Sequence, residues 1–64
     1  MVREISREEA ETLLTETEIT STKVKQKDNK VDVMLTLADD HTCLVRFDRD
    51  NGEKHYFVQQ SKPQ

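Results

Sequence analysis

The chain has 64 residues, of which 33% are hydrophobic and 36% charged, and its net charge at pH 7 is −3. A chain this short buries only about 60% of the surface that its unfolded form exposes, which leaves a thin core and little room for a deep catalytic cleft. The small net charge selects no partner, the single cysteine excludes an internal disulfide, and no apolar run approaches the roughly 20 residues of a membrane span. These features predict one soluble, cytoplasmic domain over residues 1–60.

The first predicted element is a helix over residues 7–16. The letters SREE form a capping box, in which Ser6 accepts a hydrogen bond from the amide of Glu9. An apolar stripe follows at helical spacing, and glutamates occupy the opposite face. Ile5, which precedes the cap, is placed to pack on Ala10.

The second predicted element is a polar strand over residues 19–27. Its threonines favour extended chain, and Asp28 and Asn29 mark a turn at its end. Its lysines are typical of an edge strand, because charged side chains discourage pairing between sheets.

Two further strands are predicted over residues 31–47, where apolar residues alternate with polar ones. A loop at 39–41 would pair Leu37 with Cys43, and it keeps the odd-numbered residues of both strands on one buried face. A two-residue loop would slip the pairing by one residue and exchange the faces of the second strand.

The last predicted strand follows a turn at Asn51-Gly52, a pair that favours a type I′ hairpin. That turn would pair Phe47 with Tyr56 and place Asp48 opposite His55. A slip of one residue would bury Phe57 and expose Tyr56, and the sequence leaves this register open. Residues 61–64 form a polar tail, which we expect to be disordered.

The predicted fold class is therefore α+β, with one N-terminal helix packed on a three- to four-stranded antiparallel meander in two layers. The helix is expected to bury the odd-numbered face of residues 31–47.

Catalytic and metal-binding patterns are weak. His41, Cys43 and His55 are possible zinc ligands, but their spacing is not that of a structural zinc site, and the predicted register directs Cys43 into the core. The segment DRDNGE lacks the ligand spacing of a calcium-binding loop. One glycine in the chain excludes phosphate-binding and nucleophile-elbow motifs. We therefore expect no enzyme activity, no metal site and no cofactor.

The reverse face of the sheet carries the most informative residues. The predicted register places Met34, Arg46 and Phe57 in one row, with Leu44 on the same face. A contiguous apolar patch with an arginine beside an aromatic ring is typical of a binding surface. The sequence thus favours a non-catalytic interaction module that binds a protein partner or a second copy of itself through Met34, Leu44, Arg46 and Phe57.

The alternative is a weak nucleic-acid-binding protein that uses Lys23, Lys25, Arg46 and Phe57. Basic and aromatic side chains on a sheet can track phosphates and stack bases. The acidic overall charge weighs against this hypothesis. The identity of the partner, the oligomeric state and the pathway do not follow from the sequence.

Overall fold

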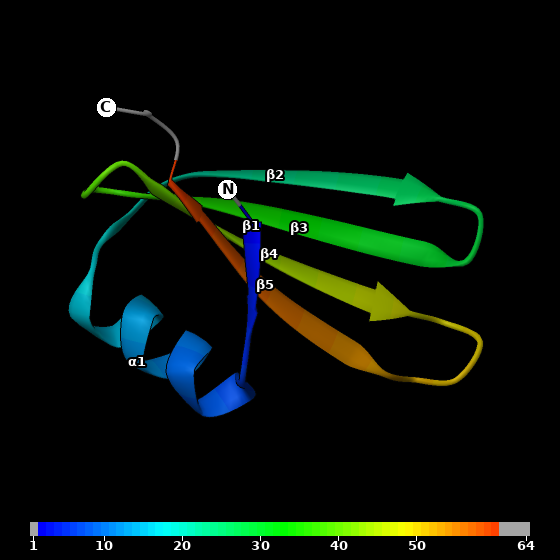
Figure 1. The fold of residues 1–64 in the computed structure, drawn as a ribbon. Helices are drawn as coiled ribbons and strands as arrows, with labels where there is room; N and C mark the ends of the chain where they lie inside the picture. The colour runs from blue at the N-terminus through cyan, green and yellow to red at the C-terminus, as the bar shows by residue number, and fades with distance from the viewer. Residues whose placement is uncertain (1, 61–64) are drawn as a thin grey trace.

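The structure, a computed structural model, describes residues 2–60 and consists of one helix packed on one face of a five-stranded antiparallel sheet (Figure 1). This confirms the predicted α+β class, with more strands than predicted. The tail predicted over residues 61–64 lies outside the described residues. In chain order the elements are β1 (Val2–Ile5), α1 (Arg7–Glu16), β2 (Ile19–Lys27), β3 (Lys30–Leu37), β4 (His41–Asp48) and β5 (Lys54–Gln60).

The start of α1 confirms the predicted N-cap. Ser6 has extended backbone angles, and its hydroxyl oxygen accepts a hydrogen bond from the amide of Glu9 at 3.1 Å. The carboxylate of Glu9 forms an ion pair with Arg3 at 3.1 Å. Ile5 and Ala10 belong to the same buried cluster, which agrees with the expected contact across the cap.

The strand order across the sheet is β1-β5-β4-β3-β2, so β2 is an edge strand, as predicted. The other edge is β1, which the sequence did not indicate. It pairs antiparallel with β5, and Val2 lies opposite Gln59. The chain therefore forms one edge of the sheet, crosses one face as α1, and begins the opposite edge with β2 (Figure 1).

The hairpin between β3 and β4 corrects the predicted register by two residues. Leu35, not Leu37, lies opposite Cys43, because the three-residue loop occupies positions 38–40 instead of 39–41. Asp40 is the last residue of this loop and has a positive φ of 70°. A three-residue hairpin loop requires a residue in this left-handed conformation. A slip of two residues leaves every side chain on its predicted face.

The connection between β4 and β5 also differs from the prediction. Asn51 and Gly52 do not form a two-residue turn, because the Asp48 amide bonds to the Glu53 carbonyl across a four-residue loop. Gly52 has a φ of +73°, and its amide bonds to the Asp48 carbonyl.

The resulting register on β5 settles which of its aromatic residues faces the helix. Tyr56 lies opposite Val45 and packs against the buried cluster under α1. Phe57 lies opposite Leu44 and therefore faces away from the helix. The predicted pairings of Phe47 with Tyr56 and of Asp48 with His55 are wrong, because Phe47 lies opposite Lys54 and His55 opposite Arg46.

The core occupies only one end of the helix-side face. The buried cluster consists of Ile5, Ala10, Leu37, Cys43 and Val58. A helix of ten residues is about 15 Å long, whereas a strand of eight residues spans about 26 Å. Figure 1 shows the strands continuing past the end of α1.

The expectation that the helix buries all odd-numbered residues of 31–47 is therefore wrong. Val31, Val33, Val45 and Phe47 are half-buried, and Val24 beside them on β2 is 64% exposed. α1 is too short to cover both ends of the sheet.

Candidate protein-interaction surface

The face of the sheet opposite α1, called here the outer face, brings together all the residues of the two predicted sites. Strand pairing places Lys23 opposite Met34, and Met34 opposite Leu44. Leu44 in turn lies opposite Phe57, and Phe57 opposite Glu4. A second line across the same face contains Lys25, Asp32, Arg46 and His55.

Met34, Leu44 and Phe57 form a continuous apolar row across β3, β4 and β5. Each of the three side chains is half-buried. Neighbouring strands lie about 4.8 Å apart, so the row extends over about 10 Å. The row differs from the predicted one, in which Arg46 stood between Met34 and Phe57, because β4 is displaced by two residues.

Arg46 lies in the second line and is held by Asp32. Its Nε donates to Oδ1 of Asp32 at 2.9 Å, and one terminal nitrogen donates to Oδ2 at 3.2 Å. This two-point hydrogen bond lowers the pKa of Asp32 and raises the pKa of Arg46. The guanidinium carbon also lies 5.9 Å from the centre of the Phe57 ring, within cation–π range.

This geometry holds the Arg46 side chain in one place on the outer face. Its two-point bond to Asp32 fixes the guanidinium beside the apolar row. The same bond occupies the groups that a phosphate would need, which removes much of the value of Arg46 for nucleic-acid binding. The sequence predicted Arg46 as a site residue, but it did not identify Asp32 as its partner.

His55 lies near the β1 edge and contacts two carboxylates. Its Nδ1 is 3.0 Å from Oε2 of Glu4 on β1, and its Nε2 is 3.6 Å from Oε1 of Glu53. The hydrogen bond to Glu4 is the main reason why the pKa of His55 is raised. These contacts replace the predicted partnership of His55 with Asp48.

Three lysines of β2 form a second feature of the outer face. Lys23, Lys25 and Lys27 alternate along the strand and face the same side of the sheet, and together they are called the basic strip. Lys27 was not among the predicted site residues, although its spacing of two from Lys25 was the available signal.

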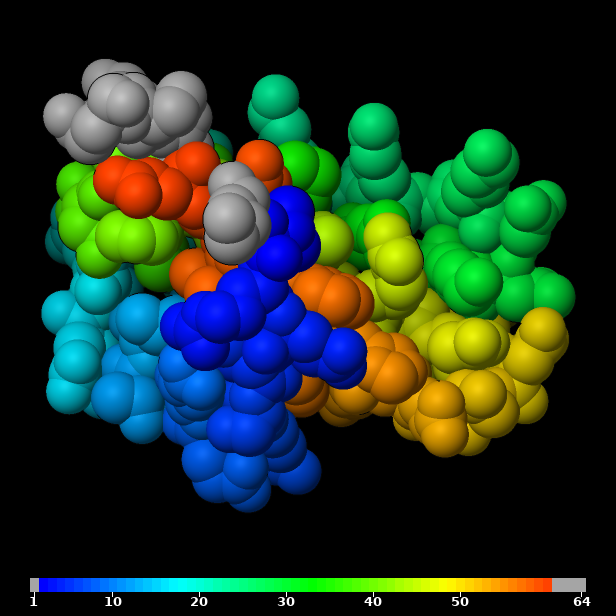
Figure 2. All heavy atoms as spheres, viewed as in Figure 1, coloured from blue at the N-terminus to red at the C-terminus, as the bar shows by residue number. Residues whose placement is uncertain are grey.

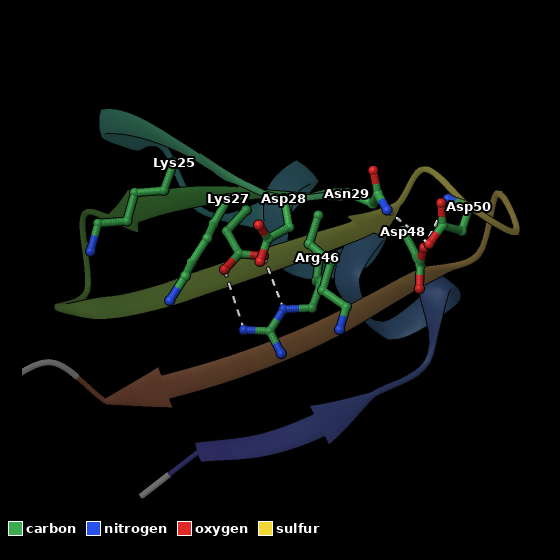
Figure 3. Close-up of a pocket in the computed structure, with 9 residues that line it drawn as sticks. Lys25, Lys27, Asp28, Asn29, Arg46, Asp48 and Asp50 are labelled. Atoms are coloured by element: carbon green, nitrogen blue, oxygen red, sulfur yellow. Dashed lines mark hydrogen bonds and ion pairs between the residues drawn. The ribbon is translucent and has the colours of Figure 1, made fainter.

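An open pocket of about 580 Å³ lies beside the basic strip, between the β2–β3 turn and the β4–β5 loop (Figure 3). Four cationic side chains line it, namely Lys25, Lys27, Lys30 and Arg46, and four carboxylates balance them, namely Asp28, Asp32, Asp48 and Asp50. Asn29 donates to the carboxylate of Asp50 at 3.0 Å, which joins the turn to the loop. A lining with balanced charge favours neither an anion nor a cation.

The possible metal-binding and nucleophilic residues do not come together. Within residues 2–60, no group of three or more His, Cys, Asp and Glu side chains is arranged to hold a metal ion. Cys43 is buried in the core, and burial raises the pKa of its thiol, which disfavours the reactive thiolate. No helix in the described part of the chain is both long and apolar enough to cross a membrane.

Comparison with known proteins adds no family to this description. No protein-family model, curated protein or solved structure gives a significant match to the chain. The chemistry of the outer face is therefore the basis on which its function is proposed.

Proposed function

We propose that this chain is a small, non-catalytic interaction module that binds a protein partner through the outer face of its sheet. The observation that carries the proposal is the apolar row of Met34, Leu44 and Phe57, which no element within residues 2–60 covers. Arg46 stands beside the row, over the Phe57 ring. Aromatic residues, Met and Arg are the types enriched at protein interfaces.

The size of the row sets the kind of contact. A row about 10 Å across supplies one anchor and not a broad interface. Such a contact belongs to the small, transient class, which buries less than about 1,200 Å² in total. A cytoplasmic location is consistent with the single free cysteine.

A second copy of the chain is the one possible partner that can be tested with this protein alone. Sedimentation of the wild-type protein over a rising concentration series would measure self-association. Phe57→Ala is expected to weaken that association by about tenfold or more, because a central aromatic anchor contributes most of the energy of a small interface.

Phe47→Ala is the matched control for this test. It removes the same ring from a half-buried position of the same sheet, but on the helix-side face. Equal loss of association in both variants would refute the outer-face contact. A wild-type protein that stays monomeric at millimolar concentration, with no partner whose retention depends on Phe57, would also refute it.

Nucleic-acid binding is the second candidate, and one observation favours it. The basic strip faces the same side of the sheet as Phe57, so lysines and an aromatic ring share one surface. This candidate predicts binding to single-stranded oligonucleotides that weakens steeply as salt rises. Absence of binding at low salt would eliminate it.

A further inference from the structure

β2 leaves an edge of the sheet open along its whole length. It is the outermost strand, and all nine of its residues are exposed. Within residues 2–60, no element pairs with its outward side. In Figure 2 its side chains project separately along the upper right margin. Because every second residue of an edge strand directs its amide and carbonyl outward, this edge can accept one more strand.

The two faces of β2 differ in chemistry. The basic strip lies on the outer face, and in Figure 3 Lys25, Lys27 and Arg46 reach out on the same side of the sheet. Thr22, Val24 and Gln26 lie on the helix-side face, opposite Leu35, Val33 and Val31. An added strand would place alternate side chains against lysines on one face and against Val24 on the other.

The lysines of the basic strip are available for a partner. Within residues 2–60, none of the three forms an ion pair or a side-chain hydrogen bond with another residue. Asp32, which lies opposite Lys25, is already bound at both carboxylate oxygens by Arg46. An acidic residue on an added strand would therefore meet lysines that form no direct ion pair, of which Lys25 is attracted through space by Asp32.

A second copy of the chain does not fit this edge. A symmetric antiparallel pair of β2 strands has its two-fold axis perpendicular to the sheet, so the outer faces of both copies lie on the same side. Full overlap of the two strands would place Lys23 opposite Lys23. A shorter overlap over residues 23–27 would place Lys25 opposite Lys25 and Lys23 opposite Lys27. Like charges directly opposite one another destabilise a strand pair.

We propose that the β2 edge binds an extended acidic segment of a partner protein, in which glutamate or aspartate alternates with β-branched or apolar residues. The acidic side chains meet the basic strip, and the alternate side chains cover Val24. The backbone of the segment pairs with β2 and extends the sheet by one strand. This inference concerns the edge of the sheet and does not depend on the apolar row.

The test uses the whole chain and an eight-residue peptide that alternates glutamate and valine. Titration of the ¹⁵N-labelled protein would follow backbone amide signals. We expect saturable shifts along β2 and slower hydrogen exchange at alternate β2 amides, because strand pairing protects them. Attraction to lysine side chains without backbone pairing would give no such protection, and that outcome would overturn the proposal.

Charge reversal gives the second measurement. Lys23→Glu with Lys25→Glu should weaken binding of the glutamate peptide by about tenfold or more and create binding of a lysine–valine peptide. Arg7→Glu with Lys54→Glu makes the same change in net charge on α1 and β5, away from β2, and should leave the glutamate peptide bound. Equal weakening by both double variants would show a general charge effect and overturn the proposal.

Competing occupants are resolved in the same experiment. Protection of β2 amides that rises with protein concentration and no peptide would assign the edge to a second copy. Tighter binding of an oligothymidine than of the glutamate peptide would assign the basic strip to nucleic acid. Either result overturns the proposal, whereas unchanged peptide binding by Phe57→Ala would support a site separate from the apolar row.

Discussion

Leu37 and Leu44 test where the core of this protein lies, because truncation to alanine removes the same atoms from both. Leu37 is 1% exposed and lies under α1, whereas Leu44 is half-buried on the outer face. Truncation of a buried leucine costs about 2–5 kcal/mol. At Leu44 the three carbon groups, each contributing about 0.8 kcal/mol when fully buried, are only partly removed from water, so the expected cost is about 1 kcal/mol.

These costs are large for a protein of this size. At about 0.05–0.15 kcal/mol per residue, the free energy of unfolding is about 3–10 kcal/mol. Urea unfolding followed by circular dichroism at low micromolar concentration would measure both variants without a contribution from association. With a slope of about 1 kcal/mol per molar urea, Leu37→Ala should lower the midpoint by about 2 M or more, and Leu44→Ala by about 1 M. Equal shifts would refute a core confined to the helix side.

Three further predictions concern local interactions. Ser6→Ala should lower the free energy of unfolding by about 1 kcal/mol, and Ser6→Gly by only a few tenths, since glycine is itself a tolerated N-cap. The hydrogen bond to Glu4 raises the pKa of His55, so this pair stabilises the fold below the ordinary pKa of histidine. The stabilisation is lost as pH rises through the raised pKa. The free energy of unfolding should therefore be larger at pH 5.5 than at pH 8 by an amount that His55→Gln removes. A double-mutant cycle of Asp32→Ala and Arg46→Ala should give a coupling energy of about 0.5–1 kcal/mol, because both side chains remain partly exposed. A coupling near zero would contradict the two-point bond.

Local patterns were sufficient for the elements whose cause is local. The hydroxyl of Ser6 and the amide of Glu9 lie within one helical turn, so the start of α1 can be predicted from four letters. The bounds of β2 follow in the same way from its threonines and from the turn that Asp28 begins. Alternation also assigned Met34 and Leu44 to one face correctly, because the period of a strand is two.

Long-range geometry was beyond the reach of the same patterns. Alternation does not distinguish registers that differ by two residues, and the left-handed conformation of Asp40 decides between them. β1 is only four residues long, and it is a strand because β5 lies beside it. The open end of the helix-side face depends on the length of α1 relative to the strands, so the half-exposed Phe47 and the exposed Val24 did not follow from hydropathy.

β1 has unequal anchorage at its two ends. Ile5 is buried in the core, whereas Val2 is 54% exposed and lies opposite Gln59 of β5. We therefore expect transient opening of β1 to begin at Val2 and to stop near Ile5, because only Ile5 is buried in the core. Amide exchange should slow progressively along these four residues. Because Val2 lies opposite Gln59 and Ile5 opposite Tyr56, such an opening would expose the edge of β5 near Gln59 and leave β5 paired near Tyr56.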